Sequence, residues 1–116
     1  MTRQQKWSVE AHKYVLAKKE DGAKAKYNTF CRKMPSIIQQ GGLVQALVFV
    51  LARGGDVGKG FVGDLAKTYG AAGEDALLKR AQDAELADYL ALSRDLIDVA
   101  VWFRRFAQIE LGDEEA

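Results

Sequence analysis

Residues 85–111 constrain the fold most, because their apolar side chains recur at helical spacing over a wide arc. At about 100° per residue, the apolar positions cover more than half of the circumference of a helix. They are Leu86, Tyr89, Leu90, Leu92, Leu96, Ile97, Val99, Ala100, Val101, Phe103 and Ala107. A helix with so wide an apolar surface packs against several neighbours at once. The segment therefore predicts a long C-terminal helix that forms the spine of an α-helical bundle.

The other periodic segments also have helical spacing. Besides the long helix, we expect helices at about residues 2–19, 23–33, 43–53, 60–69 and 74–83. Because Pro35 disfavours helical geometry at Met34, residues 35–40 are expected to form a short turn or a kinked continuation. A length of 116 residues with 48% apolar composition suits one all-α domain, residues 1–116, of about six helices. The acidic residues 113–116 are expected to fray.

Cysteine content and hydropathy indicate the compartment. The single cysteine, Cys31, excludes an internal disulfide and suits a reducing environment. The longest apolar run, residues 43–52, has about half the length that a membrane-spanning helix needs. We therefore expect a soluble protein of the cytoplasm.

Charge is distributed unevenly along the chain. Residues 1–33 carry nine Lys or Arg against three acids, a net charge of +6. Residues 84–116 carry three Arg against eight acids, a net charge of −5. Such asymmetry suits an anionic partner at the basic part and a neighbouring protein at the acidic part. The alternative is a pair of solvated helix faces that neutralise each other in the fold.

No set of residues assembles a catalytic, metal or cofactor site. The glycine-rich stretch 54–60 is one residue too short for a phosphate-binding loop, and Gly60 replaces its Ser or Thr. We expect a flexible loop between helices there. His12 and Cys31 are the only histidine and cysteine, which is too few for a zinc site. Cys31 falls on the apolar side of its helix, which favours a small buried side chain over a nucleophile.

The polar face of the C-terminal helix carries Trp102 beside Arg105. This combination is typical of interface hot spots and of base-stacking positions. That another helix covers Trp102 is an equally open alternative. Asp98 shares this face with Asp95, and we interpret both as structural or interfacial because Arg94 can pair with Asp98 four residues later.

Two sequence blocks are distinctive when taken together. The first runs from Met34-Pro35-Ser36 to Gly42-Leu43 and continues through Ala46, Val48 and Phe49. The second runs from Tyr89 through Ser93-Arg94-Asp95 to Trp102-Phe103-Arg104-Arg105-Phe106. This pattern resembles the small subunit of the type III-B (Cmr) CRISPR effector complex. The chain departs from the family pattern in having Gly41 in place of Asn and Asp95 in place of Glu.

The resemblance implies a non-catalytic subunit of an RNA-guided, RNA-targeting complex in antiviral defence. Small subunits of that family stack in several copies along the backbone filament, beside the guide RNA and its single-stranded target RNA. Other subunits carry the RNA cleavage and the nucleotide chemistry. The resemblance therefore implies a structural role without metal, cofactor or small-molecule substrate.

Clustering of charge around the first interhelical turn indicates which side chains contact RNA phosphates. These candidates are Lys18, Lys19, Lys24, Lys26, Arg32 and Lys33. Arg94, Trp102 and Arg105 are second candidates, for RNA or for a neighbouring subunit. The alternative function is a small helical protein-interaction module without nucleic-acid binding. A small enzyme, whose nucleophile could only be Cys31, is a third possibility.

Overall fold

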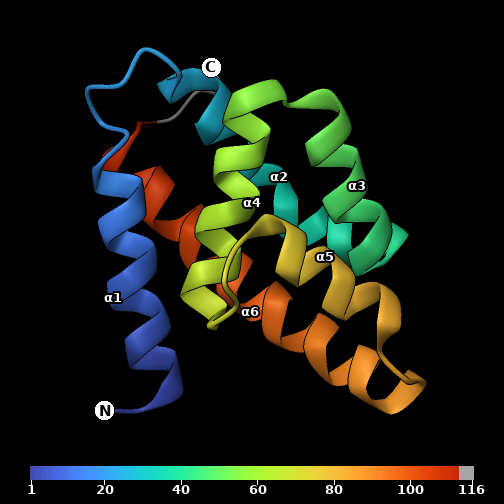
Figure 1. Ribbon diagram of the computed structural model, residues 1–116. Helices are drawn as coiled ribbons and strands as arrows, with labels where there is room; N and C mark the ends of the chain where they lie inside the picture. The colour runs from blue at the N-terminus through green and yellow to red at the C-terminus, as the bar shows by residue number, and fades with distance from the viewer. Residues whose placement is uncertain (113–116) are drawn as a thin grey trace.

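Six α-helices form the structure, a computed structural model that describes residues 1–112 (Figure 1). They are α1 (Arg3–Leu16), α2 (Lys24–Gly41), α3 (Leu43–Arg53), α4 (Gly55–Tyr69), α5 (Glu74–Asp83) and α6 (Leu86–Glu110). The predicted all-α bundle with a long last helix is confirmed. The predicted fraying of residues 113–116 concerns a segment outside the described residues. Within residues 1–112, no helix combines the length and the apolarity that crossing a bilayer requires.

The spine is α6, which packs most extensively against α2 and α1 and also contacts α4. Its buried side chains include Leu96, Val99 and Phe103, which recur every three or four residues and so share one face. Phe61 of α4 stands edge-on to Phe103, with ring centroids 5.8 Å apart, and edge-on to Tyr27 of α2, at 5.4 Å. These aromatic contacts join α2, α4 and α6 at the centre of the core.

Helix α1 begins as predicted and ends earlier. The Thr2 hydroxyl accepts a hydrogen bond from the backbone N–H of Gln5, and the Gln5 side chain accepts one from the N–H of Thr2. This reciprocal pair is a capping box, which satisfies two backbone donors at the helix start. The predicted end near residue 19 is wrong, because α1 stops at Leu16 and turns follow it.

Helix α2 is longer than predicted. The chain stays helical through Pro35 to Gly41, so of the two alternatives for residues 35–40 the structure shows the continuation of the helix and not a separate turn. Pro35 is buried on the core side of α2. Its ring therefore packs against the core, and this tertiary contact offsets the lost backbone hydrogen bond. Gly42, at φ +89°, ends the helix in a conformation that favours glycine.

The flexible loop expected at residues 54–60 is not present. Helix α4 already begins at Gly55, so Gly54 alone separates α3 from α4. Gly58 is buried against the end of α3, where a Cβ atom would lie under 3.0 Å from the carbonyl oxygen of Val50. The glycines here therefore allow two helix backbones to approach closely.

A buried hydrogen bond links α2 to α4. The Tyr27 hydroxyl donates to Oδ2 of Asp64 at 2.7 Å. Burial raises the pKa of the Asp64 carboxyl, while the hydrogen bond from Tyr27 acts in the opposite direction. Burial also raises the pKa of Tyr27, so the hydroxyl keeps the proton that it donates. This bond satisfies a carboxylate that would otherwise be costly to bury.

Replacing Tyr27 with phenylalanine is expected to destabilise the fold by about 1–3 kcal/mol, because the partly buried Asp64 loses its donor. The measurement is the free energy of unfolding in urea. Tyr69→Phe is the matched control, since the Tyr69 ring packs on Trp7 and Arg80 and its hydroxyl makes no hydrogen bond within residues 1–112. Equal stability of the two variants would contradict this role of the Tyr27 hydroxyl.

Candidate nucleic-acid interface

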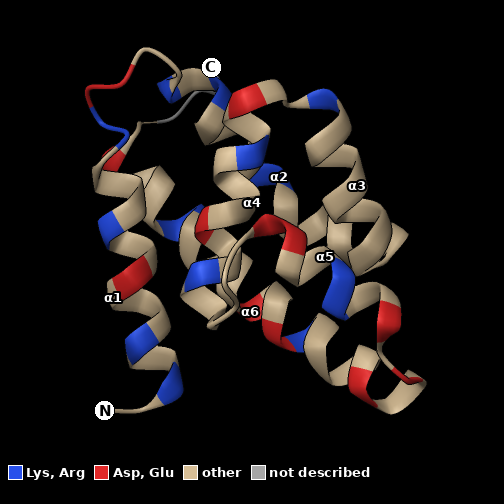
Figure 2. Ribbon diagram, in the orientation of Figure 1, with Lys and Arg blue, Asp and Glu red and all other residues tan. Residues whose placement is uncertain are grey.

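Three of the six lysine and arginine candidates face solvent without an ion-pair partner among residues 1–112. These are Lys24, Lys26 and Lys33 of α2; Lys26 and Lys33 are exposed and Lys24 is half-buried. Lys26 and Lys33 are seven residues apart and so lie on one face of the helix. Figure 2 shows the Lys and Arg residues that gather along the α1–α2 connection and the start of α2.

The position of Lys24 and Lys26 in the first turn of α2 strengthens the attraction for anions. This turn contains no acidic residue and its N-cap residue, Ala23, has no capping side chain, while Asp21 just before it accepts a hydrogen bond from the backbone N–H of Ala23 at 2.7 Å. Free backbone N–H groups already give a helix N-terminus a partial positive charge, and lysines placed there destabilise the helix further. The same arrangement favours a phosphate. The lysines at the start of α2 thus lower the stability of the helix, and they also make this end of it positively charged.

The other three candidates are engaged within the chain. Lys18 lies over the Tyr27 ring, 5.2 Å from its centroid, and pairs with Asp21 at 3.9 Å. Lys19 pairs with Glu110 at the end of α6, with 3.3 Å between Nζ and Oε1. Arg32 donates from Nη2 to the carbonyl oxygen of Gly112 at 3.4 Å. These contacts fasten the α1–α2 turn and the end of α6 to the bundle.

Glu110 also joins α6 to α1 through His12. Nε2 of His12 lies 2.8 Å from Oε2 of Glu110, and the imidazole stacks on Phe106 with ring centroids 4.2 Å apart. The hydrogen bond with His12, together with Lys19, lowers the pKa of the Glu110 carboxyl. His12 is therefore part of an interhelical contact rather than of a dyad with Cys31.

The lowered pKa of Glu110 predicts a pH dependence of stability. A carboxyl group whose pKa is depressed by folding stabilises the fold above its unfolded pKa, about 4.5, and loses this effect as the pH falls through its folded pKa. Thermal melts should therefore show wild type more stable than Glu110→Gln near neutral pH, with a difference that diminishes as the pH falls below about 4.5. Glu20→Gln, at an exposed position of the α1–α2 turn, is the control. A difference independent of pH would contradict the assignment.

The second set of candidates lies on the outer face of α6. Arg94 and Arg105 are exposed, whereas α1 partly covers Trp102. The indole Nε1 of Trp102 donates to Oε1 of Gln4 at 2.7 Å, and its ring stacks on Phe106 at 5.9 Å. Of the two alternatives for Trp102, the structure thus favours coverage by another helix. The stacking of His12 on Phe106 was missed, because the periodicity of α6 does not reveal which side chains of α1 lie against it.

The acids beside Trp102 also contact α1. Asp98 accepts a hydrogen bond from Nε2 of Gln4 at 3.3 Å, and Asp95 forms an ion pair with Arg3. Their interpretation as structural residues agrees with these contacts, although the partners come from α1 rather than from Arg94.

The only thiol is poorly suited to nucleophilic catalysis. Cys31 is fully buried between α2 and the core, and burial raises the pKa of its thiol, so the reactive thiolate is disfavoured. In the part of the chain that the structure describes, no three His, Cys, Asp or Glu side chains gather as metal ligands would. The described residues thus contain neither an activated thiol nor a metal-binding cluster.

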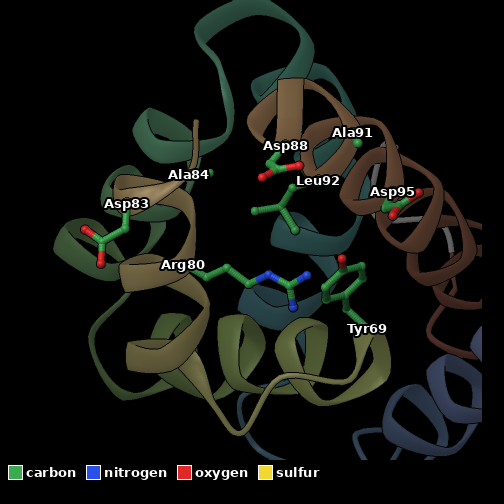
Figure 3. A pocket seen from close by; sticks show the side chains of 8 residues that line it. All are labelled: Tyr69, Arg80, Asp83, Ala84, Asp88, Ala91, Leu92 and Asp95. Carbon is green, nitrogen blue, oxygen red and sulfur yellow. The ribbon is translucent and has the colours of Figure 1, made fainter. Parts of the chain in front are cut away.

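A pocket of about 420 Å³ lies between the end of α4, α5 and α6 (Figure 3). The guanidinium of Arg80 lies 5.2 Å from the centroid of the Tyr69 ring, which closes one side. Two of the lining acids are paired elsewhere, Asp83 with Lys79 at 2.9 Å and Asp95 with Arg3. Figure 3 shows the carboxyl groups of Asp83, Asp88 and Asp95 apart from one another, so this pocket does not offer the paired carboxyl groups that acid–base chemistry would use.

Comparison with known proteins gives the family. The CRISPR-associated protein family Cas_Cmr5 matches residues 3–110, which span α1 to the last residue of α6. The chain belongs to the Cas_Cmr5 family. A curated relative, the CRISPR system Cmr subunit Cmr5 of Thermus thermophilus, is 37% identical over 107 residues, which cover 92% of this chain and 94% of the relative. The resemblance inferred from the two sequence blocks is thereby confirmed.

The Cas_Cmr5 fold is shared as well. An X-ray crystal structure of a CRISPR-associated Cmr5 family protein from Thermus thermophilus superposes with a TM-score of 0.91 at 36% sequence identity. The superposition covers 95% of this chain and 97% of the other. The six-helix arrangement described here is thus the arrangement of a Cas_Cmr5 protein along nearly its whole length.

Proposed function

We propose that this protein is a non-catalytic structural subunit of an RNA-guided type III-B Cmr effector complex in antiviral defence. Its membership of the Cas_Cmr5 family carries the proposal, because a relative of nearly equal length is named as a Cmr subunit. Its partners would be other subunits of the complex, including the backbone subunit and copies of itself stacked along the filament. We place this assembly in the cytoplasm.

The proposed RNA contact uses Lys24, Lys26 and Lys33. These side chains are available, because none of them pairs with an acid among residues 1–112. They would neutralise phosphates of the guide RNA or of the single-stranded target RNA. Contacts of this kind position an RNA without reading its bases, so binding should be independent of sequence and should weaken with salt.

A non-catalytic role is supported by the burial of the thiol and by the contacts that hold the histidine. The Cys31 thiol is buried with a raised pKa, and His12 is held by Glu110 and Phe106. Cleavage of the target RNA would then belong to another subunit of the complex.

The RNA contact can be tested by photocrosslinking within the assembled complex. Target and guide RNAs that carry 4-thiouridine would be irradiated, and the crosslinked peptides of this subunit mapped by mass spectrometry. We expect crosslinks in the peptides that surround Lys24, Lys26 and Lys33. Assembly of the subunit without any RNA crosslink would favour the alternative, a protein-interaction module that does not bind nucleic acid.

A further inference from the structure

The exposed face of α2 continues past the lysines proposed to contact RNA. Residues 22–55, which include the whole of α2 and α3, contain five Lys or Arg and neither Asp nor Glu. No carboxylate of these two helices therefore repels a phosphate that lies along them. Lys26, Lys33 and Gln40 are all exposed and follow one another at intervals of seven residues, so they share one face of α2. This face leads from the lysines to the end of the helix.

A hollow of about 270 Å³ lies at that end, where Gly42 alone separates α2 from α3. Its walls are formed by Ile37, Gln40, Gly41, Gln45 and Phe49. We call it the α2–α3 hollow. A larger hollow of about 570 Å³ adjoins it and shares part of the same wall. Along the helix axis, Gln40 lies about 10.5 Å from Lys33, at 1.5 Å per residue. A short stretch of single-stranded RNA can therefore reach both.

The walls of the α2–α3 hollow combine an aromatic ring with two amides. Phe49 is 41% exposed. The guanidinium of Arg53, which forms no ion pair among residues 1–112, lies 5.5 Å from the centroid of the Phe49 ring. Gln40 and Gln45 are exposed, and their amides make no hydrogen bond within the described part of the chain. An exposed aromatic ring beside an arginine is suited to base stacking, and free amides are suited to the edge of a base.

We propose that the α2–α3 hollow binds a nucleobase of the single-stranded RNA whose phosphates contact Lys26 and Lys33. The base stacks on the Phe49 ring, and the amides of Gln40 and Gln45 form hydrogen bonds with its edge. The inference rests on the RNA contact of the proposed function, and it adds a binding site for a base to the contacts with phosphates.

A nucleobase fits this hollow better than an apolar side chain of a partner protein does. An apolar side chain would cover Phe49 but would leave the amides of Gln40 and Gln45 without hydrogen-bond partners. A base offers a flat ring to the aromatic wall and polar atoms to the amides. Because each amide carries a donor and an acceptor, it can pair with the edge of any base, so binding stays independent of sequence.

The test compares an RNA with abasic RNA, which has the same ribose-phosphate chain without bases. Fluorescence anisotropy measures the affinity of the full chain for both labelled oligomers at about 0.05 M salt, where phosphate contacts are strong. Phe49→Ala is expected to weaken binding of the RNA about 10-fold, the effect of losing one base–aromatic stack. Its affinity for abasic RNA should equal that of wild type. The slope of log K against log salt should also stay unchanged, because no phosphate contact is removed.

Further variants separate stacking from a general change of the surface. Phe49→Trp keeps a ring for stacking and should bind RNA at least as tightly as wild type does. Replacing Gln40 and Gln45 together with alanine should weaken binding of RNA about 5-fold and leave abasic RNA unaffected. The matched control is Leu90→Ala, which alters a similarly exposed apolar side chain (49%) outside both hollows and should bind as wild type does. Circular dichroism verifies that each variant is folded.

Two kinds of failure can be distinguished. If Phe49→Ala weakened binding of both oligomers equally, or of neither, the base site would be wrong, while the contact of Lys26 and Lys33 with phosphates would stand. The hollow would then serve another ligand, such as a side chain of a partner protein. A wild-type chain that bound neither oligomer would overturn the RNA contact itself, together with the inference that rests on it.

Discussion

Replacing Lys24, Lys26 and Lys33 together with alanine is expected to weaken binding of single-stranded RNA about 100-fold at 0.1 M salt. Each phosphate contact to a single strand contributes about 0.7 to the slope of log K against log salt. Loss of three contacts should therefore lower the slope by about 2, which amounts to about two orders of magnitude at 0.1 M. The measurement is fluorescence anisotropy of a labelled RNA over a range of salt concentrations, with two RNAs of unrelated sequence.

The control removes the same charge from another region of the surface. Lys59, Lys67 and Lys79 belong to α4 and α5, and all three are exposed. Their simultaneous replacement with alanine should change the affinity and the salt slope much less. If both triple variants lost affinity equally, the effect would come from net charge alone, and the assignment of the RNA contact to α2 would be wrong.

Replacing Gly58 with alanine is expected to destabilise the protein by about 2 kcal/mol. The new Cβ would lie under 3.0 Å from the carbonyl oxygen of Val50, closer than real Cβ atoms come to other atoms. This neighbour is backbone, so it cannot rotate away, and α3 and α4 must separate. Overpacking of this kind costs about 1–3 kcal/mol, which outweighs the gain of about 0.5–1 kcal/mol from alanine in a helix.

Gly60→Ala is the matched control for Gly58→Ala. Gly60 belongs to the same helix two residues later, and a Cβ there meets no atom within 4 Å. We therefore expect Gly60→Ala to stabilise the fold by about 0.5–1 kcal/mol. Urea unfolding of both variants measures the two effects. Stabilisation by both substitutions would mean that α3 and α4 are not in close contact at Gly58.

The differences between prediction and fold have identifiable causes. The predicted bounds of α3 and α5 agree with the structure, because glycines or a strong apolar period mark both of their ends. The start of α4 was missed, because a run of glycines usually breaks a helix. At Gly58 the absent side chain instead allows close packing, and this reason becomes visible only when Val50 is placed beside it. At Pro35 the sequence left a turn and a continued helix open, and the burial of the ring in the core favours the continuation.

The candidate interface was predicted in part. Charge clustering pointed to the region around the first turn of α2. It could not show which of these lysine and arginine side chains bind other parts of the chain. Lys19 pairs with Glu110, 91 residues away, and Arg32 binds the carbonyl of Gly112, 80 residues away. Such partners cannot be recognised before the ends of the chain are brought together. The same long-range contact between α1 and α6 explains why the sequence did not determine whether another helix covers Trp102.

We propose that this Cas_Cmr5 family member works as a subunit of an RNA-guided effector complex. Purification of the tagged protein from its native host, with identification of the bound proteins and RNA, tests it most directly. We expect recovery of a set of CRISPR effector subunits together with short guide RNAs. Recovery of the protein alone, or with unrelated proteins and no RNA, would contradict it.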